Sequence, residues 1–228
     1  AEITSETLDM TGAAYGGTPD KPLAFMPIGN SSPSQSWPYR GVFRGGGCTI
    51  DYLRVEGPTK DELDAGAERY VGLFGGVDHG EIEGVNLGEH CTLSGCVGQY
   101  DDSNAAMGGI AGCTYETYLR DCTFAGTMSV AGGDGAAGGI VGEAGSVKQL
   151  QRCGNRGTIE LVDGASDGIV LGGVAAVTEG GEIVRDCYNT GTVGSEQNPP
   201  TIAGGVVGHA TWASSIYGCY NAGPVAGR

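Results

Sequence analysis

A sequence unit of about 32 residues recurs along this chain and constrains its fold more than any other feature. The clearest copy, residues 172–193, begins Gly-Gly-Val, passes a Gly-Gly turn and ends Cys-Tyr-Asn-Thr-Gly-Thr-Val. Further copies lie at 108–128, 138–159 and 204–225, with a weaker one at 71–88. Repeats with a period of 20 to 50 residues are typical of solenoids, propellers and arrays.

Within the units, an apolar anchor stands three residues before a second position that we call the ladder position. The anchors are Ile50, Ile82, Leu119, Leu150, Val184 and Ile216. The ladder positions are Leu53, Val85, Cys122, Cys153, Cys187 and Cys219, at steps of 32, 37, 31, 34 and 32 residues. A nearly constant period with insertions between anchors is what stacked coils require. The offset of three breaks strand alternation, so we expect a bend there.

Two later positions also repeat. Asn155, Asn189 and Asn221 share one of them, where the amides form either a ladder between coils or separate Asx turns. Glycine occupies the other, at Gly126, Gly157, Gly191 and Gly223. We interpret this glycine as a corner with a positive φ angle, which costs glycine nothing.

With about 32 residues and three short apolar clusters per coil, the pattern predicts an all-β fold. We expect a right-handed parallel β-helix, a three-sided β-solenoid of about five to six coils with an irregular N-terminal cap and loops. A propeller would need about 40 residues per four-stranded blade. Residues 1–40 are assigned to a capping strand and loop, and 41–228 to one continuous solenoid domain. Residues 61–69 have helical composition but suffice for only a short turn.

Composition excludes several classes of protein. The 45 glycines among 228 residues have no Gly-X-Y period, so the chain is not collagen. A net charge of −15 argues against nucleic acid and anionic membrane surfaces as partners. No apolar run is long enough to span a bilayer, so we expect no membrane insertion. No secretion signal opens the sequence, so an exported protein would begin after its signal.

The eight cysteines fall into two groups. Cys122, Cys153, Cys187 and Cys219 share the ladder position, which favours an internal stack of small side chains over disulfides. Cys48, Cys91, Cys96 and Cys113 lie outside that register, and their redox state is open. Cys91 and Cys96 are the nearest pair in sequence.

Few side chains suggest chemistry. Asp121, Arg152 and Asp186 precede ladder cysteines, and their alternating charges favour a column that sets register over a catalytic acid pair. His79, beside Asp78, is interpreted as part of a solvated turn. We predict no catalytic residue, cofactor or metal site. Residues 132–135 and 163–168 resemble calcium-binding glycine-aspartate loops, but they lack the nine-residue repeat that would complete a coordination shell. One calcium ion in a loop such as 101–104 is the alternative.

Four aromatic residues remain as candidate ligand contacts. Trp37, Tyr39, Trp212 and Tyr217 would either contact a sugar or protein, or pack over an end of the solenoid.

Several motifs resemble those of bacterial proteins with GLUG repeats. Residues 27–29 (Pro-Ile-Gly) and 41–50 (Gly-Val-Phe-Arg-Gly-Gly-Gly-Cys-Thr-Ile) are similar to the segment that opens the repeat region in that family. Residues 71–75 and the later Gly-Gly-Ile-Val-Gly and Cys-Tyr-Asn-Thr-Gly-Thr-Val runs are similar to the repeats. The resemblance extends from about residue 23 to the end. The chain departs from the pattern at Arg44, Gly46 and Ala176.

The resemblance implies a secreted or cell-surface bacterial protein. GLUG modules occur in adhesin-like proteins and in the non-catalytic region of immunoglobulin A proteases, which are zinc metallopeptidases. We therefore expect a non-catalytic module that binds a host protein or glycan or serves as a stalk, and that is monomeric when isolated. The alternatives are an accessory domain of such a metallopeptidase and a polysaccharide-active β-helix enzyme. The zinc motif of the protease is absent here, so no peptidase activity is implied.

Overall fold

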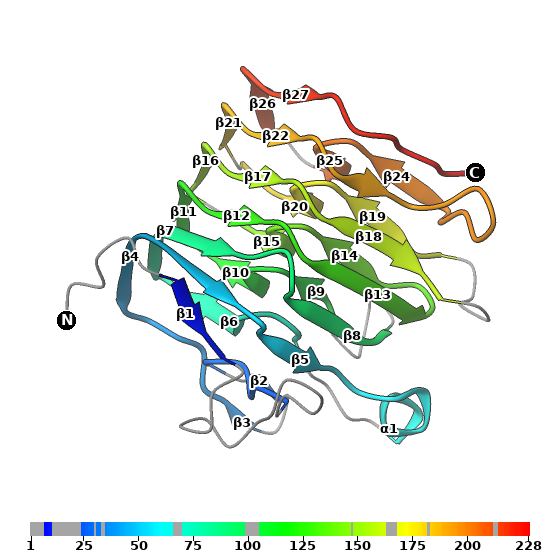
Figure 1. Ribbon diagram of the computed structural model, residues 1–228, viewed down its shortest axis with the longest axis horizontal. Coiled ribbons are helices and arrows are strands. Elements are labelled where there is room, and N and C mark those ends of the chain that lie inside the picture. Colours follow the sequence, from blue (N-terminus) through cyan, green and yellow to red (C-terminus); the bar gives the residue numbers. More distant parts are fainter. Residues whose placement is uncertain are drawn as a thin grey trace.

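The computed structural model of the chain describes residues 7–10, 24–29, 31–32, 35–65, 70–98, 105–146, 148–162, 168–181, 183–211 and 214–228. Over these residues the chain is an all-β parallel solenoid of about five coils, which stack from the N-terminal strands (blue) to the last coil (red) (Figure 1). The predicted fold class is confirmed. The coils build four parallel sheets, where three apolar clusters per coil had predicted three sides.

One sheet bends around two sides of the coil. Its strands on the first side are β4 (Val42–Asp51), β7 (Glu81–Leu87), β11 (Tyr118–Arg120), β16 (Gln149–Gln151), β21 (Ile183–Arg185) and β26 (Ser215–Tyr217). On the second side, β7 continues into the row β12 (Thr123–Phe124), β17 (Gly154–Asn155), β22 (Tyr188–Asn189) and β27 (Tyr220–Asn221). The short strand β1 (Thr7–Asp9) joins this sheet through β4.

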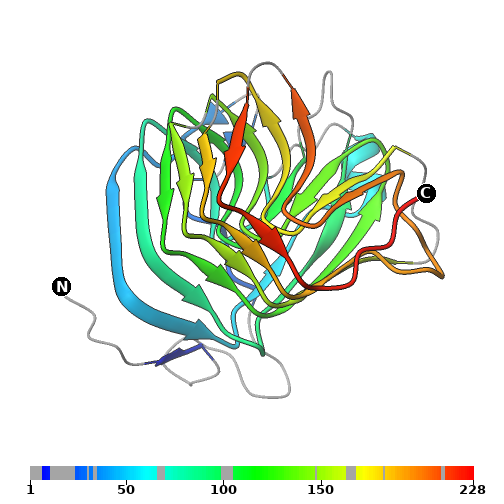
Figure 2. The same ribbon diagram turned by 90° about the horizontal axis from the view of Figure 1, so that it is seen from above.

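Three further sheets complete each coil, and we name each sheet after the strand that one central coil contributes to it. The β18 sheet contains β5 (Arg54–Glu56), β8 (Thr92–Val97), β13 (Thr127–Gly132), β18 (Thr158–Leu161) and β23 (Thr192–Val193). The β14 sheet contains β9 (Met107–Gly108), β14 (Ala136–Gly138), β19 (Val170–Gly172) and β24 (Ile202–Gly204). The β15 sheet contains β6 (Phe74–Asp78), β10 (Ala111–Tyr115), β15 (Val141–Gly145), β20 (Ala175–Glu179) and β25 (Val207–Thr211). One full coil therefore runs from β14 to β18 (Figure 2).

The predicted anchors form a continuous column inside the stack. Ile82, Leu119, Leu150 and Val184 pair in register from coil to coil and are completely buried. Ile216 is the next member of the column, but it is 44% exposed because it lies in the last coil. Each coil thus buries its apolar face against its neighbours, as stacking requires.

The first coil was aligned wrongly by the sequence pattern. Phe43, and not Ile50, pairs with Ile82, and Cys48, and not Leu53, lies beside Val85 in the ladder column. The register of β4 shifts between Arg44 and Cys48, where a bulge accommodates extra residues. Because of this insertion, the spacing of three residues between anchor and ladder position does not hold in the first coil.

The expected bend between anchor and ladder position is present in the structure. The residue before each ladder position has a positive φ angle, at Gly84 (67°), Asp121 (53°), Arg152 (51°), Asp186 (54°) and Gly218 (66°). Since aspartate tolerates this region better than most residues, two of the three non-glycine members suit the corner.

The glycines that follow the asparagine column do not form the corners with positive φ angles that the sequence predicted. Gly126, Gly157, Gly191 and Gly223 do not have positive φ angles. A methyl group on Gly157 would instead collide with the carbonyl oxygen of Gly126, and one on Gly191 with that of Gly157. Glycine is therefore required because the backbones of successive coils approach too closely for any side chain.

The N-terminal residues cover the first coil. β1 pairs in parallel with the end of β4, and Ala24, Ile28 and Tyr39 form single bridges to residues of the first coils. Leu8, Phe25 and Ile28 pack against the core. A two-residue antiparallel pair, β2 (Ser31–Ser32) with β3 (Gln35–Ser36), lies between Ile28 and Tyr39 in the sequence.

Helical structure is confined to one turn in the described residues. α1 (Lys60–Asp64) is closed by a capping box between Thr59 and Glu62, in agreement with the short turn expected for 61–69. No helix in the described part of the chain has the length and apolar character needed to cross a membrane.

Candidate functional site

The asparagine positions form a ladder and also close local turns. The Asn155 side-chain amide donates to the Asn189 oxygen at 2.7 Å, and Asn189 donates to Asn221 at the same distance. The Asn155 oxygen also accepts from the backbone N–H of Gly157 at 3.1 Å. Both alternatives from the sequence therefore occur together, and Asn155 and Asn189 are completely buried. These residues hold the coils in register.

The four ladder cysteines point into the interior. Cys122, Cys153 and Cys187 have no exposed surface, and Cys219 is partly buried at the end of the column. Their thiols donate to backbone carbonyls, as Cys187 does to Leu150 at 3.4 Å. Burial raises the pKa of Cys153 well above the usual thiol value. This column is part of the core.

All eight cysteines are free thiols in the structure. Cys48 joins the ladder column, although the sequence pattern placed it outside. Cys91 and Cys96 form no disulfide with each other. The pKa of Cys91 is raised to about 11 by burial, so this thiol also stays protonated near neutral pH.

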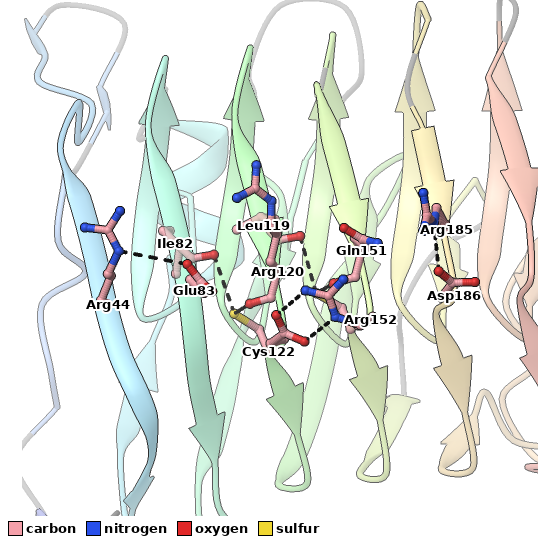
Figure 3. Close-up of polar contacts among 12 residues, drawn as sticks. Arg44, Ile82, Glu83, Leu119, Arg120, Cys122, Gln151, Arg152, Arg185 and Asp186 are labelled. Atoms are coloured by element: carbon pink, nitrogen blue, oxygen red, sulfur yellow. Dashed lines mark hydrogen bonds and ion pairs between the residues drawn. The ribbon is translucent and has the colours of Figure 1, made fainter. Parts of the chain in front are cut away.

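The charged side chains at the bend before the ladder positions pair with one another. Arg152 donates two hydrogen bonds of 2.6 Å to Asp121 in the preceding coil, and Arg185 donates one of 2.8 Å to Asp186 (Figure 3). Arg44 makes longer ion pairs with Glu83 and Glu81 in the next coil. Because the arginines occupy the carboxylates, this face has the character of a register-setting surface and not of an acid pair around a substrate.

The aromatic residues suggested as ligand contacts do not form one site. Tyr39 packs against Phe74, with ring centres 5.1 Å apart, and belongs to the N-terminal cap. Trp37 is 75% exposed near that cap, while Tyr217 is exposed in the last coil. Trp212 lies outside the described residues.

A small apolar cluster lies between the β14 and β15 sheets, outside the main core. Ala137 of β14 packs in the main core, whereas its neighbour Ala136 belongs to this second cluster. Side chains alternate across a strand, so the two alanines face opposite sides of the sheet. We call the second cluster the outer cluster. Its members are Ala106, Ala136, Val170, Ala176 and Val177, with Tyr70 packed against them.

Glu143 is the most strongly perturbed carboxyl group beside the outer cluster. It lies on β15, between Cys113 of β10 and Val177 of β20. Burial, together with the negative charge of Glu179, raises the pKa of Glu143 to about 7. Burial and the neighbouring Glu143 raise the pKa of Cys113 to about 12. A carboxyl group that titrates near neutral pH is suited to donating or accepting a proton.

Stability should therefore depend on the charge of Glu143. Its pKa is raised in the folded state, so the native protein holds more protons than the unfolded chain between about pH 4.5 and pH 7, and stability falls as the pH rises through that window. We expect Glu143→Gln to stabilise the protein by about 2 kcal/mol at pH 8 and to change little at pH 4. Urea unfolding at the two pH values measures this. An equal effect at both would contradict it.

A pocket of about 460 Å³ opens between the N-terminal cap and the β15 sheet. We call it the side pocket. Its lining residues are Pro38, Arg40, Tyr70, Gly76, Val77, Asp78, His79, Cys113 and Tyr115. Tyr70 also contacts the outer cluster, so the two features adjoin.

Polar groups in the side pocket are fixed by one another. Arg40 donates to Asp78 at 2.6 and 2.8 Å, and His79 Nδ1 lies 2.5 Å from the other carboxylate oxygen. The hydrogen bond with His79, and then Arg40, lower the pKa of Asp78, so this carboxylate is ionised. Tyr115 is 50% exposed, and its ring lies 5.9 Å from that of His79. The pocket thus offers an aromatic face beside an ordered polar cluster.

A larger cavity of about 760 Å³ lies beside α1. Several of its polar residues are engaged, as they are in the side pocket: Thr59 and Glu62 form the capping box, Lys60 binds Asp64, and Glu56 pairs with Arg54. We prefer the side pocket because it also presents the exposed ring of Tyr115 beside its polar cluster.

Metal binding finds no support in the described residues. They contain no group of three or more histidine, cysteine, aspartate or glutamate side chains placed to hold an ion. The loop 101–104, considered for calcium, lies outside the described residues, as do 163–167.

Comparison with known proteins adds no relative: no protein-family model, no curated protein and no solved structure matches the chain. The likeness to GLUG-repeat proteins therefore depends on the motifs alone.

Proposed function

We propose that this chain is a non-catalytic binding module of an exported bacterial surface protein, and that it binds a glycan in the side pocket. The observation that carries the proposal is the exposed ring of Tyr115 beside the Arg40–Asp78–His79 cluster. The GLUG-like motifs support the location on the cell surface. The stacked coils give the pocket a rigid base, since its walls come from paired strands.

A sugar matches the two kinds of surface in the pocket. Sugar rings present an apolar face of C–H groups, which pack on aromatic rings, and hydroxyl groups, which bond to fixed polar side chains. Tyr115 supplies the first surface. Asp78 supplies an oriented hydrogen-bond acceptor. Because Arg40 already holds its carboxylate in place, little side-chain entropy is lost when a ligand binds.

Binding to an array of glycans, followed by calorimetry with the best ligand, tests the proposal. We expect Tyr115→Ala to weaken binding at least tenfold, or about 1.4 kcal/mol, because the apolar platform is lost. Tyr217→Ala is the matched control, because Tyr217 is similarly exposed but lies in the last coil. Loss of binding in the control alone would place the site at the other end. No binding to any glycan would favour a stalk.

A polysaccharide-active enzyme is the second candidate, and Glu143 favours it. This carboxyl has a pKa near 7, and Glu179 lies on β20 two residues beyond the strand partner of Glu143. A carboxyl group with a raised pKa near a second carboxyl group is an arrangement used in glycoside hydrolysis. An assay for new reducing ends on the same glycans separates the two functions: turnover that Glu143→Gln abolishes would replace the binding proposal.

A further inference from the structure

Two carboxyl groups lie on the same face of the β15 sheet as the side pocket. The inner face of this sheet is marked by completely or almost completely buried side chains, among them Thr114, Ala144 and Thr178. Side chains alternate across a strand, so the residues on either side of each of these point outward. The outward side chains are Cys113 and Tyr115 of β10, Glu143 of β15 and Glu179 of β20.

Strand pairing places both carboxyl groups beside the pocket. Glu143 pairs with Cys113, which lines the pocket, so its strand lies about 4.8 Å further along the stack. Tyr115 pairs with Gly145, which in turn pairs with Glu179. The strand of Glu179 therefore lies about 10 Å from that of Tyr115.

Gly145 leaves the way from the pocket to these carboxyl groups open. A β-carbon added to Gly145 would lie 3.5 Å from the carbonyl oxygen of Thr114 and 3.7 Å from the ring of Tyr115, both ordinary contacts. No side chain separates Tyr115 from Glu179 at this strand position, because the residue between them is glycine. A ligand that stacks on Tyr115 can therefore extend over Gly145 toward both carboxyl groups.

The surroundings of Glu143 supply negative charge. The titratable groups that face it are Cys113 on β10 and Glu179 on β20, and Tyr70 forms a hydrogen bond with Cys113. The β14 sheet faces this side with the alanine and valine side chains of the outer cluster. Burial and the charge of Glu179 raise the pKa of Glu143 to about 7, and no lysine or arginine in the described part of the chain offsets them. A positively charged ligand group would supply the missing charge.

We infer that the ligand of the side pocket is an amino sugar whose free, positively charged amino group binds between Glu143 and Glu179. The inference rests on the glycan proposal and names the class of glycan. An ammonium group donates charge-assisted hydrogen bonds to carboxylates, and these are about twice as strong as neutral ones. Arg40 does not compete for this role, since it already binds Asp78.

The same arrangement selects against other sugars. An N-acetyl group has no positive charge to offer to the two carboxyl groups. A sugar acid would bring a third negative charge to them, in a chain that already carries −15. Because Glu143 is half-buried, salt screens these interactions less than it screens those of exposed charges.

Calorimetry with glucosamine oligosaccharides and with N-acetylated oligosaccharides of the same length tests the inference. At about pH 6, where an amine is charged, we expect the amino form to bind at least tenfold more tightly. Glu143→Gln should remove this preference and leave the affinity for the N-acetylated form unchanged. Glu160→Gln is the matched control, because it removes the same charge from the outer face of the β18 sheet.

Proton release gives a second measurement. A bound ammonium group favours the ionised form of Glu143 and lowers its pKa, so the protein should release a proton when the amino form binds at about pH 6. Titrations in two buffers with different ionisation enthalpies detect this proton. The release should be absent in Glu143→Gln and present in Glu160→Gln.

The possible results separate this inference from the glycan proposal. A preference for the amino form that Glu143→Gln removes and Glu160→Gln keeps supports the inference. Equal binding of the two forms, both weakened by Tyr115→Ala, would overturn it and keep the glycan proposal. A preference that persists in Glu143→Gln would also overturn it, since the net charge of the chain would then explain the selectivity. Failure of every glycan to bind would overturn both.

Discussion

Replacing Gly157 by alanine is expected to destabilise the solenoid by about 3 kcal/mol, since an added methyl group overpacks a site with no free space. The β-carbon would collide with the carbonyl oxygen of Gly126 in the preceding coil. The β-carbon is bonded directly to the backbone of one coil and the oxygen belongs to the backbone of the other, so relief requires the coils to separate, which weakens the interface that holds each coil in place. Thermal unfolding should show a fall in Tm of roughly 6–12 °C.

Gly145→Ala is the matched control. Gly145 also lies in a strand, at the end of β15, but an added β-carbon there would lie 3.5 Å from the carbonyl oxygen of Thr114, an ordinary contact. We expect a change within about 0.5 kcal/mol, because alanine also restricts the unfolded chain. Equal losses at Gly157 and Gly145 would show that backbone proximity between coils is not what requires glycine.

Asn189→Ala is expected to cost about 3 kcal/mol, because it removes the middle of a buried hydrogen-bonded column. The substitution leaves one amide hydrogen of Asn155 and the carbonyl oxygen of Gly191 without the bonds they make to Asn189. Buried polar groups that lose a partner pay the full cost of their lost hydration. Denaturant unfolding measures the difference in free energy.

The end of the same column provides the comparison. Asn221 also accepts a bond from Asn189, but it is exposed, so water can replace the lost partner. Asn221→Ala should therefore cost less than about 1 kcal/mol. If both substitutions cost the same, burial does not determine the strength of the ladder.

The stack of coils was predictable because its signal is repeated. The spacing of Leu119, Leu150 and Val184 identifies equivalent positions without any knowledge of the fold, and the structure pairs them in register. The first coil was misaligned because the bulge in β4 adds residues between Phe43 and Cys48. The role of Gly157 was misread since sequence alone does not distinguish a turn from a close backbone approach.

The side pocket could not be read from the sequence. Arg40 and Asp78 are 38 residues apart and meet because the N-terminal segment folds back over the first coil. Cys113 and Tyr115 arrive from the next coil, through the pairing of β10 with β6. The position of Glu143 was equally hidden, because the repeat pattern does not say that its strand faces the outer cluster. The residues of the side pocket and Glu143 do not recur at the repeat spacing, so the sequence pattern does not show that they meet in the folded chain.

Within these 228 residues, the pairing of β1 with the first coil also gives unfolding a direction. In a linear array, a terminal coil has one neighbour and an internal coil has two, so loss of structure begins where the single neighbour is the only support. Among the described residues that place is the coil of β24–β27, whereas the first coil also pairs with β1. The coils are therefore expected to unfold locally from the β24–β27 side first. Amide protons should exchange fastest in that coil and progressively more slowly toward the first coil.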